Sequence, residues 1–100
     1  MTKKIYTLVE ISEKVTRIAK DFGVEKVYLF GSYARGDADA TSDLDFRVDK
    51  GSVRGFAFGG LCNALEDTFD KPVDVVTTAS LDKSFLEAIK SEEVLLYAAN

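Results

Sequence analysis

Residues 26–48 read KVYLFGSYARGDADATSDLDFRV, and this stretch decides the fold. Its first five residues are mostly β-branched or aromatic and stop at Gly31, which predicts a buried strand over 26–30. A polar, turn-rich segment follows from Ala34 to Ser42. Residues 43–48 then alternate polar and apolar with a period of two, which predicts a second strand. Its acidic side chains would face one way and its apolar side chains would face a core, namely Leu44, Phe46 and Val48.

The chain on either side of this stretch predicts helices and one more strand. Apolar residues recur at helical spacing over 8–22, before Gly23, and over 53–69, where three glycines weaken the pattern. Residues 73–77 are valine-rich and predict a strand, Ser80 is the expected N-cap of a last helix through Ile89, and residues 94–97 form an apolar end. This order predicts an α/β (α+β) fold in one domain over 1–100, with a small mixed β-sheet and helices packed on one face.

The composition excludes several kinds of chemistry. The chain has 100 residues, 13 basic and 17 acidic, a net charge of −4, no histidine and one cysteine, Cys62. Ser-His-Asp and Cys-His catalysis, a disulfide within the chain and a cysteine zinc cluster are therefore excluded, so any metal is expected to be a hard cation held by oxygen. The acidic balance argues against binding a nucleic-acid polymer through its phosphates. The apolar runs are too short for a signal peptide or a membrane span, which predicts a cytoplasmic protein.

Gly31 and Ser32 form the first candidate site. A glycine at a strand-to-helix corner lets backbone N–H groups approach a phosphate, and a serine there adds a hydroxyl donor. The spacing from Gly31 to Gly36 fits the Walker A phosphate loop, but the lysine and hydroxyl residue that this loop needs are replaced by Asp37 and Ala38. A plain turn is the alternative interpretation of these residues.

Three aspartates form the second candidate site. Asp43 and Asp45 point to the same side of a strand, and Asp74 would join them if its strand lies alongside. Such a cluster repels itself without cations, so it predicts divalent metal, two Mg²⁺ about 3.5–4 Å apart. A solvated strand face is one alternative. A calcium loop beginning at Asp37 is another, but Ser42 and Val48 occupy the positions where that loop requires glycine and glutamate.

Together these residues resemble the nucleotidyltransferase superfamily typified by DNA polymerase β. The resemblance rests on Gly31-Ser32, ten intervening residues, Asp43-Leu-Asp45 and the later Asp74. The chain is most similar to the minimal nucleotidyltransferase (MNT) branch, the antitoxins of HEPN/MNT toxin–antitoxin pairs. The match extends from Val24 to Tyr97 and includes residues 34–36, Ser42, 73–76, 80–81 and 94–97. Gly55, Gly59 and Gly60 depart from the regular helix expected after the Asp-x-Asp strand.

The resemblance implies a reaction and a role for each site residue. The reaction is transfer of a nucleoside monophosphate, AMP from ATP, to a hydroxyl with release of pyrophosphate. Gly31 and Ser32 would hold the β- and γ-phosphates, and Arg35 or Arg47 would either offset phosphate charge or pair with nearby acids. Asp43 and Asp45 would bind both Mg²⁺ ions, whereas Asp74 would complete the second metal site and help deprotonate the acceptor.

The resemblance also implies a partner. In the MNT branch the acceptor is a tyrosine of a HEPN ribonuclease toxin, and the chain would act as its antitoxin. One hundred residues leave no room for the extra helical domain of larger members, so we expect another chain to supply the acceptor. Two alternatives stay open: transfer to a small molecule such as an aminoglycoside, and a non-catalytic module with a relic site. Candidate docking side chains for such a module are Phe56, Phe58 and Phe85.

Overall fold

A computed structural model describes residues 2–53 and 56–99 and contains one four-stranded sheet. The strands are β1 (Lys26–Phe30), β2 (Leu44–Asp49), β3 (Val73–Thr77) and β4 (Val94–Ala98). Their order in the sheet is β3-β2-β1-β4. Strand β1 is antiparallel to both of its neighbours, whereas β2 and β3 run parallel, so the sheet is mixed as predicted.

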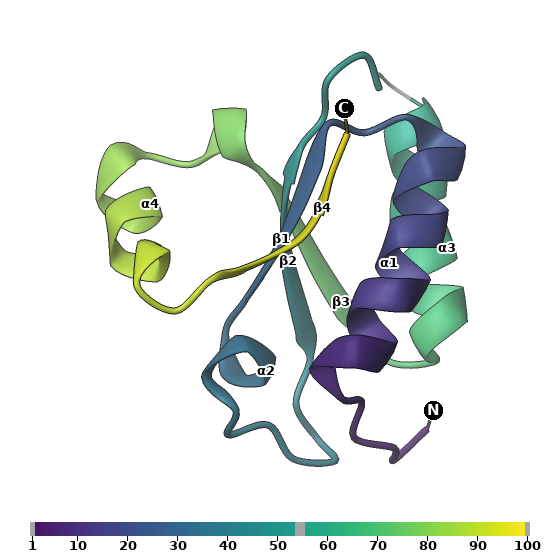
Figure 1. The fold of residues 1–100 in the computed structure, drawn as a ribbon, viewed down its shortest axis with the longest axis vertical. Coiled ribbons are helices and arrows are strands. Elements are labelled where there is room, and N and C mark those ends of the chain that lie inside the picture. Colours follow the sequence, from purple (N-terminus) through teal and green to yellow (C-terminus); the bar gives the residue numbers. More distant parts are fainter. Residues whose placement is uncertain (1, 54–55, 100) are drawn as a thin grey trace.

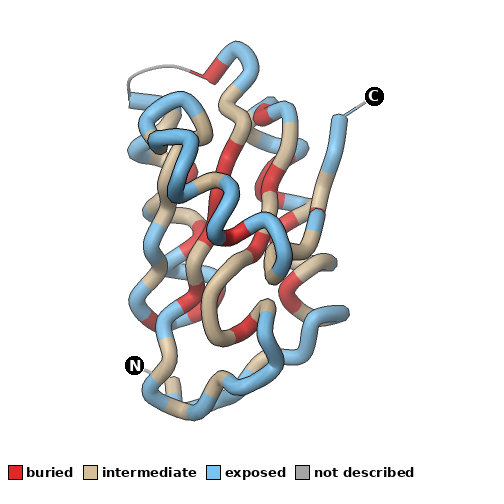
Figure 2. Tube along the Cα trace, turned by 90° about the vertical axis from the view of Figure 1, so that its left-hand side faces the viewer, coloured by how far each residue is buried: buried red, intermediate tan, exposed pale blue. Residues whose placement is uncertain are grey.

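Helices α1 (Leu8–Phe22) and α3 (Phe56–Phe69) lie side by side on one face of the sheet (Figure 1). The core lies between these helices and the sheet, where the buried parts of the tube in Figure 2 gather. Strand β2 contributes Leu44, Phe46 and Val48 to this core, at most 1% exposed, as the alternation predicted. Since these three side chains point toward the helices, the alternating residues Asp45 and Arg47 point to the opposite face.

Helix α1 begins and ends as its sequence predicts. Thr7 is the N-cap, its hydroxyl accepts from the Glu10 backbone N–H, and the Glu10 side chain accepts from the Thr7 N–H in return. Gly23 ends the helix in the left-handed conformation, with φ 74°. The predicted bounds 8–22 are therefore confirmed.

Three local predictions need correction, and the unassigned apolar end proves to be a strand. A one-turn helix, α2 (Ser32–Arg35), occupies the start of the segment expected to be turns, and α3 begins at Phe56 rather than at residue 53. The flanking Gly55 lies outside the described residues. Ser80 is not an N-cap, because it lies in a 3-10 turn, η1 (Thr78–Ser80), and its hydroxyl donates to the Thr77 carbonyl. Asp82 caps α4 (Lys83–Lys90) instead, and the apolar end of the chain forms β4 as a full edge strand.

Helix α4 lies on the other side of the sheet from α1 and α3 (Figure 1). Its main apolar contacts are Ile89, which is buried, and Phe85, whose ring meets that of Phe30 edge-on at 5.9 Å. Phe85 remains 40% exposed and Phe56 is fully exposed, whereas Phe58 packs against the core. No helix in the described ranges has the length and apolarity needed to cross a bilayer.

Candidate functional site

The chain turns sharply at Gly31, between β1 and α2. Gly31 has φ 78° and ψ −158°, a backbone conformation that only glycine adopts readily. It also lies directly against Asp45, because a Cβ placed on Gly31 would be 2.2 Å from Asp45 Oδ2. Glycine is thus required here both by the backbone and by the space. The turn brings Ser32, the first residue of α2, to the same end of the sheet as Asp45.

Asp45 and Asp74 face each other across the parallel strands β2 and β3, where they are paired in register. The prediction that Asp74 lies beside the Asp-x-Asp strand is therefore confirmed. Burial of Asp45, the negative charges of Asp74 and Asp43, and a hydrogen bond with Asp74 raise the Asp45 pKa to about 6. Arg35 acts in the opposite direction and lowers this pKa. Negative charge is therefore concentrated at this end of the sheet.

Asp43 lies just before β2 and is exposed. It lines a cavity of about 410 Å³ together with Thr41, Lys71 and Pro72. Across residues 2–53 and 56–99, no three acidic or cysteine side chains are gathered into a ready metal-binding group. The arrangement is a close pair, Asp45 and Asp74, with Asp43 near enough to act on Asp45 through its charge.

The donor chemistry of these three aspartates, the carboxylate site, nevertheless fits Mg²⁺. All the donors are carboxylate oxygens, which hard cations prefer. The repulsion that contributes to the raised Asp45 pKa is the kind that a bound cation relieves. A carboxylate of this kind can also accept a proton from a hydroxyl placed against it.

The two arginines considered for phosphate binding are both engaged with acids. Arg35 is exposed and pairs with Asp37 at 3.2 Å and with Glu92 at 2.9 Å. These groups raise the Arg35 pKa. Since this pairing is at the surface, Arg35 can exchange its partners for a phosphate at little cost.

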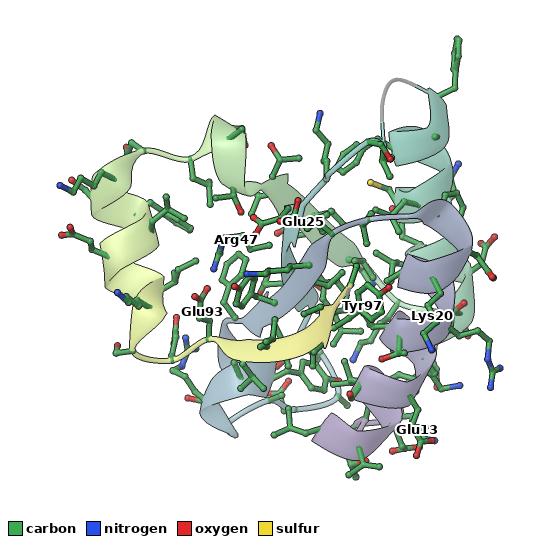
Figure 3. All side chains as sticks on the ribbon, turned by 45° about the horizontal axis from the view of Figure 1, so that its top comes forward. Glu13, Lys20, Glu25, Arg47, Glu93 and Tyr97 are labelled. Carbon is green, nitrogen blue, oxygen red and sulfur yellow. The ribbon has the colours of Figure 1, made fainter. Side chains whose placement is uncertain are left out.

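Arg47 is buried and points to Glu93 on the segment before β4 (Figure 3). Its Nε and Nη2 donate to the Glu93 carboxylate at 3.0 and 2.7 Å, and Nη1 donates to Thr78 Oγ1 at 2.8 Å. The guanidinium also lies 3.9 Å from the Tyr28 ring centroid. Arg47 therefore fastens both ends of the segment that carries α4, and its donors are not directed to a phosphate.

The acids of the loop before β2 bind neighbouring residues of the chain. Asp39 Oδ1 accepts from the Thr41 backbone N–H at 2.8 Å and from the Thr41 hydroxyl at 2.6 Å. These bonds lower the Asp39 pKa. Asp37 pairs with Arg35. The first two ligands that a calcium loop would need, Asp37 and Asp39, therefore already have other partners.

Sequence reasoning missed Lys71 and Tyr33. Lys71 is 4% exposed, and its Nζ donates to the Tyr33 hydroxyl at 2.7 Å. A lysine beside a proline after a helix gives no sign of burial, so no local signal could have identified this contact.

The family model described as "Polymerase beta, Nucleotidyltransferase" matches residues 13–100. Protein adenylyltransferase MntA of Thermococcus cleftensis is 34% identical over 93 residues, which is 88% of this chain and 94% of that protein.

Two solved structures share the fold. One, described as a candidate minimal nucleotidyltransferase, has TM-score 0.75 and 29% identity over 89% of this chain and 95% of that one. The other is an MNT antitoxin in complex with a tri-AMPylated HEPN toxin from Shewanella oneidensis. It has TM-score 0.69 and 21% identity over 93% of this chain and 74% of that chain.

Proposed function

This chain belongs to the polymerase β nucleotidyltransferase family, and from that premise we propose that it transfers AMP from ATP to a tyrosine hydroxyl of a partner protein. The observation that carries the proposal is the convergence of Gly31, Asp45 and Asp74 at one end of the sheet. The name of the Thermococcus relative, a protein adenylyltransferase, supports ATP as donor and protein as acceptor.

In the proposed step, the acceptor oxygen forms a bond to the α-phosphorus of ATP. The bond from that phosphorus to the oxygen bridging the α- and β-phosphates breaks, and pyrophosphate leaves with the electron pair. The hydroxyl proton passes to a carboxylate oxygen of Asp74, beside Asp45. This gives one AMP-tyrosine bond and one pyrophosphate for each ATP consumed.

Each site residue has a role in this proposal. Gly31 and Ser32 hold the β- and γ-phosphates, since the glycine permits close approach of the backbone and the serine adds a hydroxyl. Arg35, at the end of α2, turns from its exposed acids to the phosphates. Arg47 has a structural role, because its guanidinium is committed to Glu93 and Thr78.

Asp43, Asp45 and Asp74 are the proposed ligands of two Mg²⁺ ions. Bound Mg²⁺ would neutralise triphosphate charge and lower the pKa of a hydroxyl held beside it. The raised pKa of Asp45 supports this assignment, because, after burial, its causes are the neighbouring negative charges of Asp74 and Asp43, which a cation would offset. The carboxylates themselves orient the donor and acceptor groups on the face of the sheet opposite α1 and α3.

We further propose that the partner is a HEPN-type toxin, that the chain is its antitoxin, and that residues 1–100 act as one cytoplasmic domain. The antitoxin complex that shares the fold supports this partner. The proposal includes no membrane contact and no binding to a nucleic-acid polymer, in line with the net charge of −4.

The decisive experiment combines the chain, Mg²⁺, one labelled NTP at a time and a HEPN-type toxin. Mass spectrometry of tryptic peptides then locates any nucleotide. The expected result is a gain of AMP on a toxin tyrosine, lost in Asp43→Asn and Asp45→Asn and kept in Asp67→Asn, whose residue is exposed on α3. If no nucleotide is transferred and Mg²⁺ with ATP leaves the melting temperature unchanged, the chain is a non-catalytic binding module.

A further inference from the structure

Lys71 is a buried cation for which the proposed reaction has no use. We propose that Lys71 is a positioning residue, which fixes the corner formed by Gly31 and Ser32 relative to Asp74 by holding the Tyr33 hydroxyl. The inference deepens the proposed function and rests on it for the role of the corner in nucleotide binding. Its geometry stands on contacts that do not depend on that function.

The contact joins two parts of the site that are distant in sequence. Lys71 lies between α3 and β3, three residues before Asp74. Tyr33 directly follows Ser32 in α2 and is 5% exposed. Lys71 Nζ lies 2.7 Å from the Tyr33 hydroxyl and 5.0 Å from the centroid of its ring. The side chains thus tie the first turn of α2 to the start of the strand that bears Asp74.

The buried charge of Lys71 fixes the position of the Tyr33 hydroxyl. The ion pairs found among residues 2–53 and 56–99 do not include Lys71, and its observed hydrogen-bond acceptor is Tyr33. A buried ammonium is costly unless its donors are satisfied, so the Tyr33 oxygen is held at a defined place. An apolar pair of the same size would fill the space, but it would lack the hydrogen bond that holds the two side chains in one position.

Helix α2 needs such an anchor because it is a single turn of four residues. A helix this short has almost no stability of its own, so its tertiary contacts determine its position. At its far end, Arg35 pairs with Glu92 at the surface, a contact that solvent weakens. The buried Tyr33–Lys71 contact is therefore the stronger of the two polar anchors. Any shift of α2 moves Ser32, which begins it.

Lys71 also lies near one residue of the carboxylate site. Lys71 and Asp43 both line a cavity of about 410 Å³. The tie is therefore next to a space that Asp43 also lines. This place agrees with a residue that sets the spacing between the corner and the carboxylates.

The test compares Tyr33→Phe, Lys71→Met and the double variant in the full-length chain. Tyr97→Phe and Lys20→Met are matched controls: Tyr97 packs against the core on β4, and Lys20 is exposed on α1 (Figure 3). Calorimetric titration with Mg²⁺ and a non-hydrolysable ATP analogue gives the Kd. Each single variant should weaken binding about tenfold, equal to about 1.4 kcal/mol, with the controls unchanged. The double variant should bind the ATP analogue no more weakly than either single variant, because both substitutions remove the same contact.

Steady-state transfer to the partner supplies a readout that loss of stability alone would not move. We expect KM for ATP to rise about tenfold while kcat stays within about twofold, because we assign the corner equal contacts to the β- and γ-phosphates in bound ATP and in the leaving pyrophosphate. If Tyr33→Phe fails to fold around the orphaned ammonium, the double variant, whose pair is apolar, carries the test and should bind about tenfold more weakly than wild type.

The outcomes separate the two proposals. If the wild-type chain binds and transfers nucleotide but both single variants keep its Kd and KM, the role of Lys71 is overturned and the proposed function stands. The same holds if the effects of the two substitutions multiply in the double variant. Absence of nucleotide binding and transfer in the wild-type chain overturns the proposed function, and the positioning role with it.

Discussion

Asp45 lies opposite Asp74 across the parallel pair β2–β3, and the negative charge of Asp74 helps to raise the pKa of Asp45. Burial of the Asp45 carboxyl, and next the negative charges of Asp74 and Asp43, raise the Asp45 pKa to about 6. The acid pair is the centre of the proposed site, and most of the following predictions concern its surroundings.

Replacing Asp45 by asparagine should lower the transfer rate at least ~100-fold, because it removes the carboxylate that we propose orients the acceptor and holds cations. The fold should persist, since asparagine has the same shape. Labelled AMP incorporation into the toxin measures the rate. Asp67→Asn on α3 is the control, and a wild-type rate in Asp45→Asn would falsify the assignment.

Gly31→Ala should abolish nucleotide binding, because its Cβ would meet Asp45 Oδ2 at 2.2 Å. The backbone conformation of Gly31, φ 78° and ψ −158°, adds a strain of about 1–3 kcal/mol for alanine. Gly36→Ala is the matched control, because Gly36 has φ 86° but no neighbouring atom within 4 Å of the added Cβ. Gly36→Ala should therefore lower the stability of the fold but leave nucleotide binding unchanged. Titration with an ATP analogue and thermal melting distinguish the two effects, and equal binding by both variants would contradict the proposed contact.

In metal-free buffer, acidification from pH 7 to pH 5 should increase the free energy of unfolding contributed by Asp45. The folded-state pKa, about 6, is higher than the usual 3.8, so ionisation disfavours the folded state. This penalty is complete above pH 6 and disappears as the pH falls toward 4. Urea unfolding of wild type and Asp45→Asn checks the sign: the difference between them should shrink at pH 5. A difference that is independent of pH would refute the shift.

Arg47→Met should destabilise the fold by about 3 kcal/mol, because it leaves the Glu93 carboxylate, 13% exposed, without its partner. The double variant Arg47→Met, Glu93→Leu should recover much of this loss. The Kd for nucleotide should change little in the double variant, since Arg47 is fastened to the α4 segment. A selective loss of nucleotide affinity would instead restore the phosphate role considered from sequence.

Local patterns predicted most of the elements. The alternation of residues 43–48 gave the buried face of β2, and the glycine after Phe22 gave the end of α1, because periodicity and caps are properties of neighbouring residues. The N-cap of α4 was predicted wrongly at Ser80 because serine and aspartate cap helices about equally well, and Asp82 lies two residues further on. The edge strand β4 cannot be assigned from its sequence, because a short apolar run has no helical or strand signature of its own.

The sequence alone determined the kinds of residue in the site: glycine and serine at a corner, and three aspartates whose spacing identifies the family. Only the tertiary structure decided which of them meet. The order β3-β2-β1-β4 places Asp74 beside Asp45, the turn at Gly31 closes on the same carboxylate, and burial brings Lys71 to Tyr33. Such contacts join residues tens of positions apart, and they depend on strand order and packing, which no local pattern encodes.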